Sequence, residues 1–343
     1  MAVVVGVALV SFGVFAATTS PGALLQMRAP SAGPVALTPV VLPRAGGSFA
    51  GRIAFLAGSP PGGVLGKGDV YVLDGSGRPA VRLTHLNGKL GKPTWSPGGG
   101  SLVFPLGRTV FRPWNLYALS VANGRLTQIS GADAFDQNPV WSPDGTMIAF
   151  ASDRPGNPNY EIYSMSADGQ NVRRLTFDPG FDTEPTWSPD GSRIAFVSSR
   201  AGRVGRDNWE IFTMSADGSG SKRLTHDDFF DHDPAWSPDG SRIAFAVNRG
   251  RGDHRIMVMD ADGSSLATVF ACSNSCSSIE GGPAWSPDGS MMAFAVEMKD
   301  GLGAVKQRID VMDANGHNLL QLDTGPLDVC CPAWGMPATS SGQ

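Results

Sequence analysis

Residues 185–196 read PTWSPDGSRIAF, and residues 234–245, 49 positions later, read PAWSPDGSRIAF. Weaker copies of the same phrase stand on both sides of this pair. Tryptophan recurs at intervals of 46 or 49 residues, at Trp95, Trp141, Trp187, Trp236, Trp285 and Trp334. Self-similarity at such a period indicates a repeat architecture, here of six units.

Each unit carries the signals of four short strands. Trp187 is followed by Ser-Pro-Asp-Gly, then by the apolar triplet Ile194-Ala-Phe196, then by Glu210-Ile-Phe and Arg223-Leu-Thr, and other units repeat this order. Proline sets φ at the second position of a type I turn, and glycine supplies the positive φ that closes a hairpin. The sequence therefore predicts an all-β fold, a six-bladed β-propeller of four-stranded antiparallel blades.

The tryptophans and the two ends of the repeat predict how the ring is assembled. Both faces of a run such as RIAFVS are apolar, as in a sheet covered on both sides, so we expect the six tryptophans to be structural wedges between blades. The triplet Ile53-Ala-Phe55 has no tryptophan before it, and Trp334 has no triplet after it. We expect residues 332–334 to pair with residues 51–56, so that the C-terminal strand completes the first blade and closes the ring.

The pattern D-x-x-P-x-W-S-P-D-G-x-x-I-A-F, with a following E-I-Y and R-L-T, resembles the WD-like propeller repeat of the TolB family. The resemblance covers residues 48 to 336. It implies the propeller and says little about function, because functional sites are grafted onto folds. In the family an α/β domain precedes the propeller, and this sequence is expected to have only a linker there.

The two ends of the chain differ from the repeat. Residues 1–17 form an apolar run that we expect to be a signal peptide or an N-terminal membrane anchor, and both alternatives stay open. Residues 18–47 are rich in Pro, Ala and Gly and read as a linker, and residues 337–343 read as a flexible tail. The propeller is expected at residues 48–336, in an extracytoplasmic location that is periplasmic, secreted or membrane-anchored.

Charge excludes one class of partner. The chain has 27 Lys and Arg against 31 Asp and Glu, so it lacks the basic surplus that neutralises a phosphate backbone. We expect no nucleic acid partner, no cofactor and a monomer that recognises a protein, a peptide or a glycan.

The candidate binding site lies on one face of the predicted ring. The Ser-Pro-Asp-Gly turns fall on one face, and the opposite face carries loops of variable length and charge, where binding sites usually lie. The candidate ligand-binding residues at this channel mouth are Asp136, Asp182, Asp231, His232, Asp233, Glu280, Arg154, Arg200 and Arg249.

Two interpretations of these charges remain open. In the first, the inner carboxylates accept backbone N–H groups where the inner strands begin, and each arginine pairs with an acid such as Glu161 or Glu210. In the second, an acidic throat with a basic rim binds a zwitterionic peptide or a polar sugar.

One acidic, histidine-containing segment and four cysteines are the residues that bear on metal and disulfide chemistry. The segment 225–233, THDDFFDHD, is dense in metal-capable side chains but meets no ligand-spacing motif, so no metal site is predicted. The four cysteines, Cys272, Cys276, Cys330 and Cys331, are disulfide candidates in an exported chain, and Cys272 with Cys276 is the simplest pair.

The sequence is compatible with two functions. The first is a non-catalytic extracytoplasmic binding scaffold, and the alternative is a propeller hydrolase or lyase with its active site in the central channel, acting on a peptide or a carbohydrate. No nucleophile, base and orienting group recur or cluster as an active site requires, so we favour the scaffold.

Overall fold

The computed structural model describes residues 49–58, 68–75, 79–86, 88–108, 113–156, 159–201, 208–250, 252–272, 276–299, 305–322 and 328–336. The chain divides into two units, Met1–Val35 and Ala36–Gln343, and every described residue belongs to the second. The expected signal peptide or anchor, the linker and the C-terminal tail lie outside the described residues. Within the described ranges no helix has the length and apolar character needed to cross a membrane.

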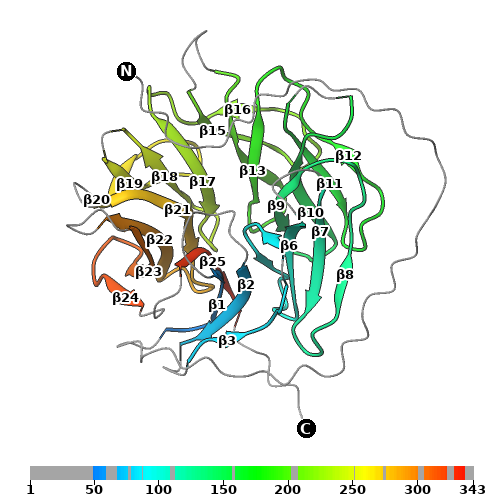
Figure 1. Ribbon diagram of the computed structural model, residues 1–343. Coiled ribbons are helices and arrows are strands. Elements are labelled where there is room, and N and C mark those ends of the chain that lie inside the picture. The colour runs from blue at the N-terminus through cyan, green and yellow to red at the C-terminus, as the bar shows by residue number, and fades with distance from the viewer. Residues whose placement is uncertain are drawn as a thin grey trace, which may run out of the picture. The chain divides into compact units, whose positions relative to one another are not determined.

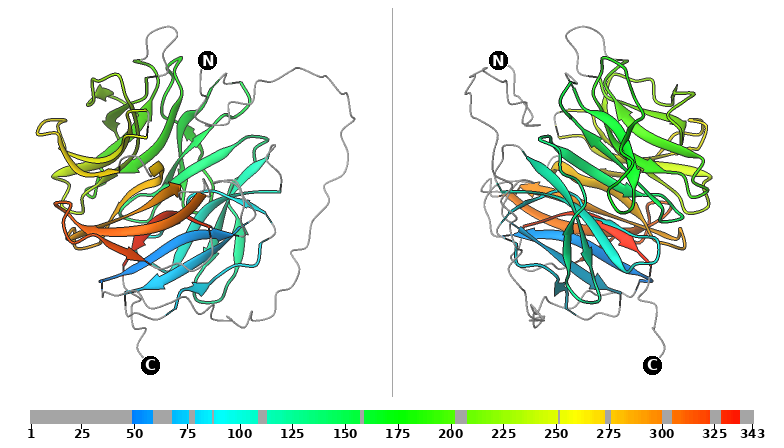
Figure 2. Two further views of the ribbon diagram at one scale, coloured as in Figure 1. Left: turned by 60° about the vertical axis from the view of Figure 1, so that its left-hand side comes forward. Right: turned by 90° about the vertical axis from the view of Figure 1, so that its right-hand side faces the viewer.

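The described strands form six antiparallel sheets, which are the six blades of a propeller (Figures 1 and 2). Blade 1 consists of β25 (Asp328–Gly335), β1 (Arg52–Gly58), β2 (Gly68–Asp74) and β3 (Val81–Arg82). Blade 2 consists of β4 (Lys89–Leu90), β5 (Thr94–Trp95), β6 (Ser101–Gly107), β7 (Trp114–Ser120) and β8 (Leu126–Gln128). Blade 3 consists of β9 (Asp136–Trp141), β10 (Met147–Ser152), β11 (Glu161–Ser166) and β12 (Arg173–Arg174).

The remaining blades follow the same order from the inner to the outer strand. Blade 4 consists of β13 (Asp182–Trp187), β14 (Arg193–Ser198), β15 (Glu210–Ser215) and β16 (Lys222–Arg223). Blade 5 consists of β17 (Phe230–Trp236), β18 (Arg242–Asn248), β19 (His254–Asp260) and β20 (Ala267–Cys272). Blade 6 consists of β21 (Cys276–Trp285), β22 (Met291–Lys299), β23 (Val305–Asp313) and β24 (Leu320–Leu322).

The ring closes as the sequence predicted. β25 pairs antiparallel with β1, with Trp334 opposite Ile53 and Ala333 opposite Ala54, so both ends of the repeat share blade 1. Closure in this way removes the unpaired edge that an open ring would expose. Blade 2 departs from four strands because its inner strand is split into β4 and β5, which both pair with β6.

The core lies between blades. The phenylalanines of the six apolar triplets are among the largest fully buried side chains: Phe55, Phe104, Phe150, Phe196, Phe245 and Phe294. The tryptophans act as wedges: Trp95 Nε1 donates to the Ala333 carbonyl and Trp285 Nε1 to the Ala235 carbonyl, each at 3.1 Å and each across a blade boundary. These contacts agree with the structural role expected for the tryptophans.

The Ser-Pro-Asp-Gly phrase builds the hairpin between the first two strands of a blade. Ser188 Oγ donates to Asp190 Oδ1 at 2.5 Å and accepts the Arg193 N–H at 2.9 Å, while Gly191 has a φ of 70°. Hydrogen bonds from Ser188 and Ser192 lower the pKa of Asp190 to about 2. The repeated phrase is therefore a folding unit, and its serine and aspartate are occupied within the turn.

The ring has two faces. The turn face carries the Ser-Pro-Asp-Gly turns that follow the inner strands. The connector face carries the links between blades and the loops between the second and third strands.

Candidate ligand-binding channel

A cavity of about 450 Å³ lies among the inner strands of all six blades. It reaches from the residues three positions before the tryptophans to the Ser-Pro pairs of the turn face. Its walls include the proline that stands two positions before each tryptophan: Pro93, Pro139, Pro185, Pro234, Pro283 and Pro332. A volume of this size is in the range of small-molecule pockets, about 300–1,000 Å³.

A β-bulge in the inner strand of five blades shapes the floor of this cavity, and in blade 2 the inner strand is split into β4 and β5. In blade 4, Thr183 pairs with Val197 and Thr186 with Ala195, so Glu184 and Pro185 together stand opposite the single residue Phe196. The residue three positions before the tryptophan has a positive φ in five inner strands: Asn138 (49°), Glu184 (52°), Asp233 (52°), Gly282 (48°) and Cys331 (62°). Bulges redirect side chains, and a left-handed backbone at non-glycine residues is strain that concentrates at functional sites.

The polar floor of the cavity is formed by Lys92, Asn138, Glu184 and Asp233. Inner strands contact one another in the order β5, β9, β13, β17, β21 and β25, and β25 returns to β5. Lys92 and Asp233 therefore belong to opposite blades of the ring. Lys92 Nζ donates to Asp233 Oδ1 at 2.8 Å, so this ion pair crosses the channel.

Two further groups contact Asp233. Its backbone N–H donates to Glu184 Oε2 at 2.5 Å, and His232 Nδ1 lies 3.2 Å from Asp233 Oδ2. Burial raises the pKa of Glu184 to about 7, and the negative charge of Asp233 adds to this rise. Burial alone would raise the pKa of Asp233, but the Lys92 ammonium and His232 hold it well below its usual range.

Ligand atoms of Glu184, His232 and Asp233 all lie within 4.8 Å of one another. Burial would lower the pKa of His232, but its hydrogen bond with Asp233 and the charge of that carboxylate raise it. Because the Lys92 ammonium already pairs with Asp233, we interpret these groups as an ion-pair network and not as a metal centre. Their convergence places acid and base groups side by side at the floor of the cavity.

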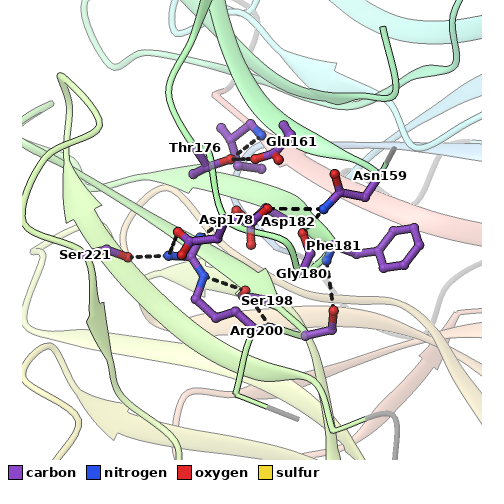
Figure 3. Close-up of polar contacts among 12 residues, drawn as sticks. Asn159, Glu161, Thr176, Asp178, Gly180, Phe181, Asp182, Ser198, Arg200 and Ser221 are labelled. Carbon is purple, nitrogen blue, oxygen red and sulfur yellow. Dashed lines mark hydrogen bonds and ion pairs between the residues drawn. The ribbon is translucent and has the colours of Figure 1, made fainter. Parts of the chain in front are cut away.

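The inner carboxylates of blades 3 and 4 lie elsewhere. Asp136 and Asp182 have no exposed surface. Asp136 accepts Ser152 Oγ at 2.6 Å and Arg154 at 3.1 Å, and Asp182 accepts Arg200 at 2.5 Å (Figure 3). Because these side chains close over the carboxylates, they do not line a throat at the channel mouth as the second interpretation expected.

The expected arginine pairing also differs. Arg154 and Arg200 pair with the inner aspartates, whereas Glu161 and Glu210 pair with Arg174 and Arg223, each at 2.5 Å. Asp136 and Asp182 accept hydrogen bonds from the side chains of Ser152, Arg154 and Arg200, whereas the first interpretation expected backbone N–H groups. The reason is the second strand of each blade, which brings a serine and an arginine to the start of the inner strand.

Blade 5 differs from blades 3 and 4. Asp231 is fully buried, and neither of its carboxyl oxygens has a hydrogen-bond partner among the described residues. Burial raises the pKa of Asp231 to about 8, and the negative charges of Asp227 and Glu210 add to the rise. The guanidinium of Arg249 lies over the Phe229 ring, 4.0 Å from its centroid.

The other predicted residues occupy separate places. Glu280 accepts a hydrogen bond from Ser278 Oγ at 2.7 Å, and burial raises its pKa. Cys272 and Cys276 form a disulfide that joins β20 of blade 5 to β21 of blade 6. Cys330 and Cys331 are buried free thiols on β25.

Sequence reasoning missed Lys92, Asn138 and Glu184. Each stands directly before a proline and three residues before a tryptophan, in the same alignment position as Asp233. That position is occupied by Lys, Asn, Glu, Asp, Gly and Cys in successive units, while the proline beside it is constant. Among the six repeat units the residue before the proline varies while the proline is constant. This contrast is the sequence signal that could have predicted the residues of the cavity floor.

Comparison with known proteins identifies the family. The family model of the TolB beta propeller domain matches residues 64–178 and 159–338. The chain belongs to the TolB beta-propeller family. No curated protein matches this sequence.

Solved structures similar to this TolB-family propeller include two described as TolB. TolB from Acinetobacter baumannii is 24% identical with a TM-score of 0.70, over 85% of this chain and 68% of that chain. A putative TolB from Agrobacterium tumefaciens is 22% identical with a TM-score of 0.60, over 83% and 98% of the two chains. An oligogalacturonate lyase from Vibrio parahaemolyticus is 16% identical with a TM-score of 0.53, over 83% and 78%. At these identities the likeness concerns the fold.

Proposed function

We propose that this TolB-family propeller is a non-catalytic extracytoplasmic binding module that admits a segment of a protein or peptide partner into its central channel. The single observation that carries the proposal is the cavity of about 450 Å³ with a charged floor built on strained bulges. The apolar run at residues 1–17 and the Cys272–Cys276 disulfide support the extracytoplasmic location.

The chemistry of the cavity suits a peptide segment. Its proline-rich walls offer apolar surface, and its floor offers an ammonium group on Lys92 and carboxylate oxygens on Glu184. A peptide presents carbonyl oxygens to the first and N–H groups to the second. The cavity lies toward the turn face, whereas the sequence placed the binding site on the opposite, variable face.

A capture experiment tests this proposal. Immobilised full-length protein is incubated with an envelope extract, and bound proteins are identified by mass spectrometry. Thr186 lines the cavity, so Thr186→Trp should fill part of it and remove the specific partner. Val172 is 42% exposed and lies outside the cavity, so Val172→Trp is the matched control and should keep the partner. Equal capture by both variants would refute binding in the channel.

A second candidate is a propeller hydrolase or lyase, and one observation favours it. Glu184, His232 and Asp233 converge at the cavity floor, and a carboxyl group with a pKa of about 7 is suited to general base catalysis. The test is turnover of a peptide library and of uronate oligosaccharides by the wild type and by Glu184→Gln. Turnover that the variant loses would establish the enzyme, and absence of turnover in both would leave the binding module.

A further inference from the structure

Three blades place an aspartate and an arginine at equivalent positions. Asp136, Asp182 and Asp231 stand five residues before a tryptophan, and Arg154, Arg200 and Arg249 each follow 18 residues after the aspartate. In blades 3 and 4 the arginine folds inward onto its aspartate. Figure 3 shows this arrangement in blade 4, where Arg200 contacts Asp178, Asp182 and Ser198.

In blade 5 the equivalent residues, Asp231 and Arg249, do not pair with each other. Asp231 has no hydrogen-bond partner among the described residues, although it is completely buried. Arg249 is exposed and lies over the Phe229 ring. Asp231 is equivalent to the aspartates that pair with a guanidinium in blades 3 and 4, but the equivalent arginine, Arg249, lies on the surface.

One substitution in the second strand explains the outward position. Ser198 is the register partner of Asp182, and its Oγ accepts Arg200 Nε at 2.9 Å. Val247 is the register partner of Asp231, so the hydroxyl that holds the inward arginine is missing in blade 5. The Phe229 ring supplies the alternative contact, because an aromatic face attracts a guanidinium.

The backbone at Arg249 does not oppose an inward position. The Arg249 N–H donates to the Asp253 carbonyl at 3.0 Å, and the Gly250 N–H donates to Asn248 Oδ1 at 2.9 Å, so the backbone of Arg249 and Gly250 is held in place. Only the side chain has to turn, as in Arg154 and Arg200, which leave their loops at the equivalent position.

The charged groups around Asp231 favour an arriving cation. Glu210 on β15 and Asp227 in the connector before β17 act on Asp231 as negative charges, and His232 on its own strand acts as a positive one. Glu210 is itself paired with Arg223. An inward guanidinium would favour loss of the Asp231 proton and would then pair with the resulting carboxylate.

We propose that Arg249 is a two-position side chain, which rests on the Phe229 ring and turns inward onto Asp231 when that ring no longer holds it. Phe229 belongs to the connector face, whereas the cavity lies toward the turn face. The two positions of Arg249 therefore lie on the connector face of blade 5, outside the channel.

The inward position would also reach the channel floor through β17. Asp231 stands two residues before Asp233, which holds the Lys92 ammonium across the channel. A positive charge brought to Asp231 changes the field at His232 and Asp233. The inward turn of Arg249 and binding in the cavity would then influence each other by the same factor, as linkage requires.

The test is the titration of Asp231 followed by carboxyl carbon-13 NMR in the full-length protein, with the signal assigned by its loss in Asp231→Asn. Phe229→Leu removes the aromatic face and keeps an apolar side chain, so Arg249 should turn inward and lower the Asp231 midpoint by about 2 pH units. Phe229→Tyr keeps the face and should titrate like the wild type.

Arg249→Met in the Phe229→Leu background identifies the cation. The midpoint should return to the wild-type value, because no guanidinium remains to pair with Asp231. The Asp182 signal, whose pairing with Arg200 is untouched, reports an intact fold in every variant. An unchanged midpoint in Phe229→Leu, or a lowered one that persists in the double variant, would overturn the proposal.

Discussion

Replacing Asp231 with asparagine should stabilise the propeller at neutral pH. The carboxyl group is fully buried without a hydrogen-bond partner among the described residues, and its pKa is raised from 3.8 to about 8. At pH 7 the folded protein keeps this proton while the unfolded chain has lost it. Each pH unit between the unfolded pKa and pH 7 corresponds to about 1.4 kcal/mol, so the penalty is at most about 4 kcal/mol.

The pH dependence distinguishes this cause from better packing. Because the folded pKa is raised, the wild type is most stable below pH 4 with respect to this group and loses stability as the pH rises toward 8. The asparagine amide does not titrate, so Asp231→Asn removes this pH-dependent penalty. The advantage of Asp231→Asn should therefore be near zero at pH 4 and largest at pH 8.

Urea unfolding at pH 4, 6, 7 and 8 measures this difference directly. Asp182→Asn is the matched control, because Asp182 has the same position in blade 4 but accepts a hydrogen bond from Arg200. Burial raises the pKa of Asp182 as well, so Asp182→Asn also removes part of a pH-dependent penalty, but it weakens a charge-assisted hydrogen bond at a cost of about 1–2 kcal/mol. A less stable Asp231→Asn at pH 8, or a gain that does not vary with pH, would refute the reasoning.

Three further predictions follow from the channel and the core. Lys92→Met leaves Asp233 buried without its cation and should cost about 3 kcal/mol, seen as a lower melting temperature; adding Asp233→Asn should recover part of the loss. Burial raises the pKa of Glu184 to about 7, so the wild type should lose stability between pH 4.5 and about 7. Glu184→Gln should abolish this loss and should be about 2–3 kcal/mol more stable than the wild type at pH 8 in denaturant unfolding. A wild type whose stability does not fall over this pH range would contradict the prediction. Phe196→Ala should cost about 3–5 kcal/mol in the same unfolding assay, because a fully buried ring leaves a cavity between blades, and a loss under 1 kcal/mol would show that the blades repack.

The repeat made the fold predictable from sequence. The Ser-Pro-Asp-Gly turn, the apolar triplet and the tryptophan act over a few residues, and each local rule is repeated in unit after unit. Ring closure could be predicted as well, because Ile53 lacked a tryptophan and Trp334 lacked a triplet. The first unit lacks the strand that the last unit supplies, so the two ends of the repeat must pair in one blade.

The contents of the channel were decided only by the tertiary structure. Lys92 and Asp233 are 141 residues apart and meet because a six-membered ring places their blades opposite each other. The bulge that directs Glu184 and Asp233 toward the axis is a property of strand pairing, and one strand read alone does not reveal it.

The aspartates of blades 3, 4 and 5 also show the difference between what the sequence predicts and what the tertiary structure decides. In sequence Asp136, Asp182 and Asp231 occupy identical positions, each with an arginine 18 residues later. In space the first two are paired and the third is not, because the partner strand brings Val247 to Asp231, and Phe229 holds Arg249 at the surface. Local turn rules act within one segment of chain, but the partner of a buried charge depends on which segments the fold brings together.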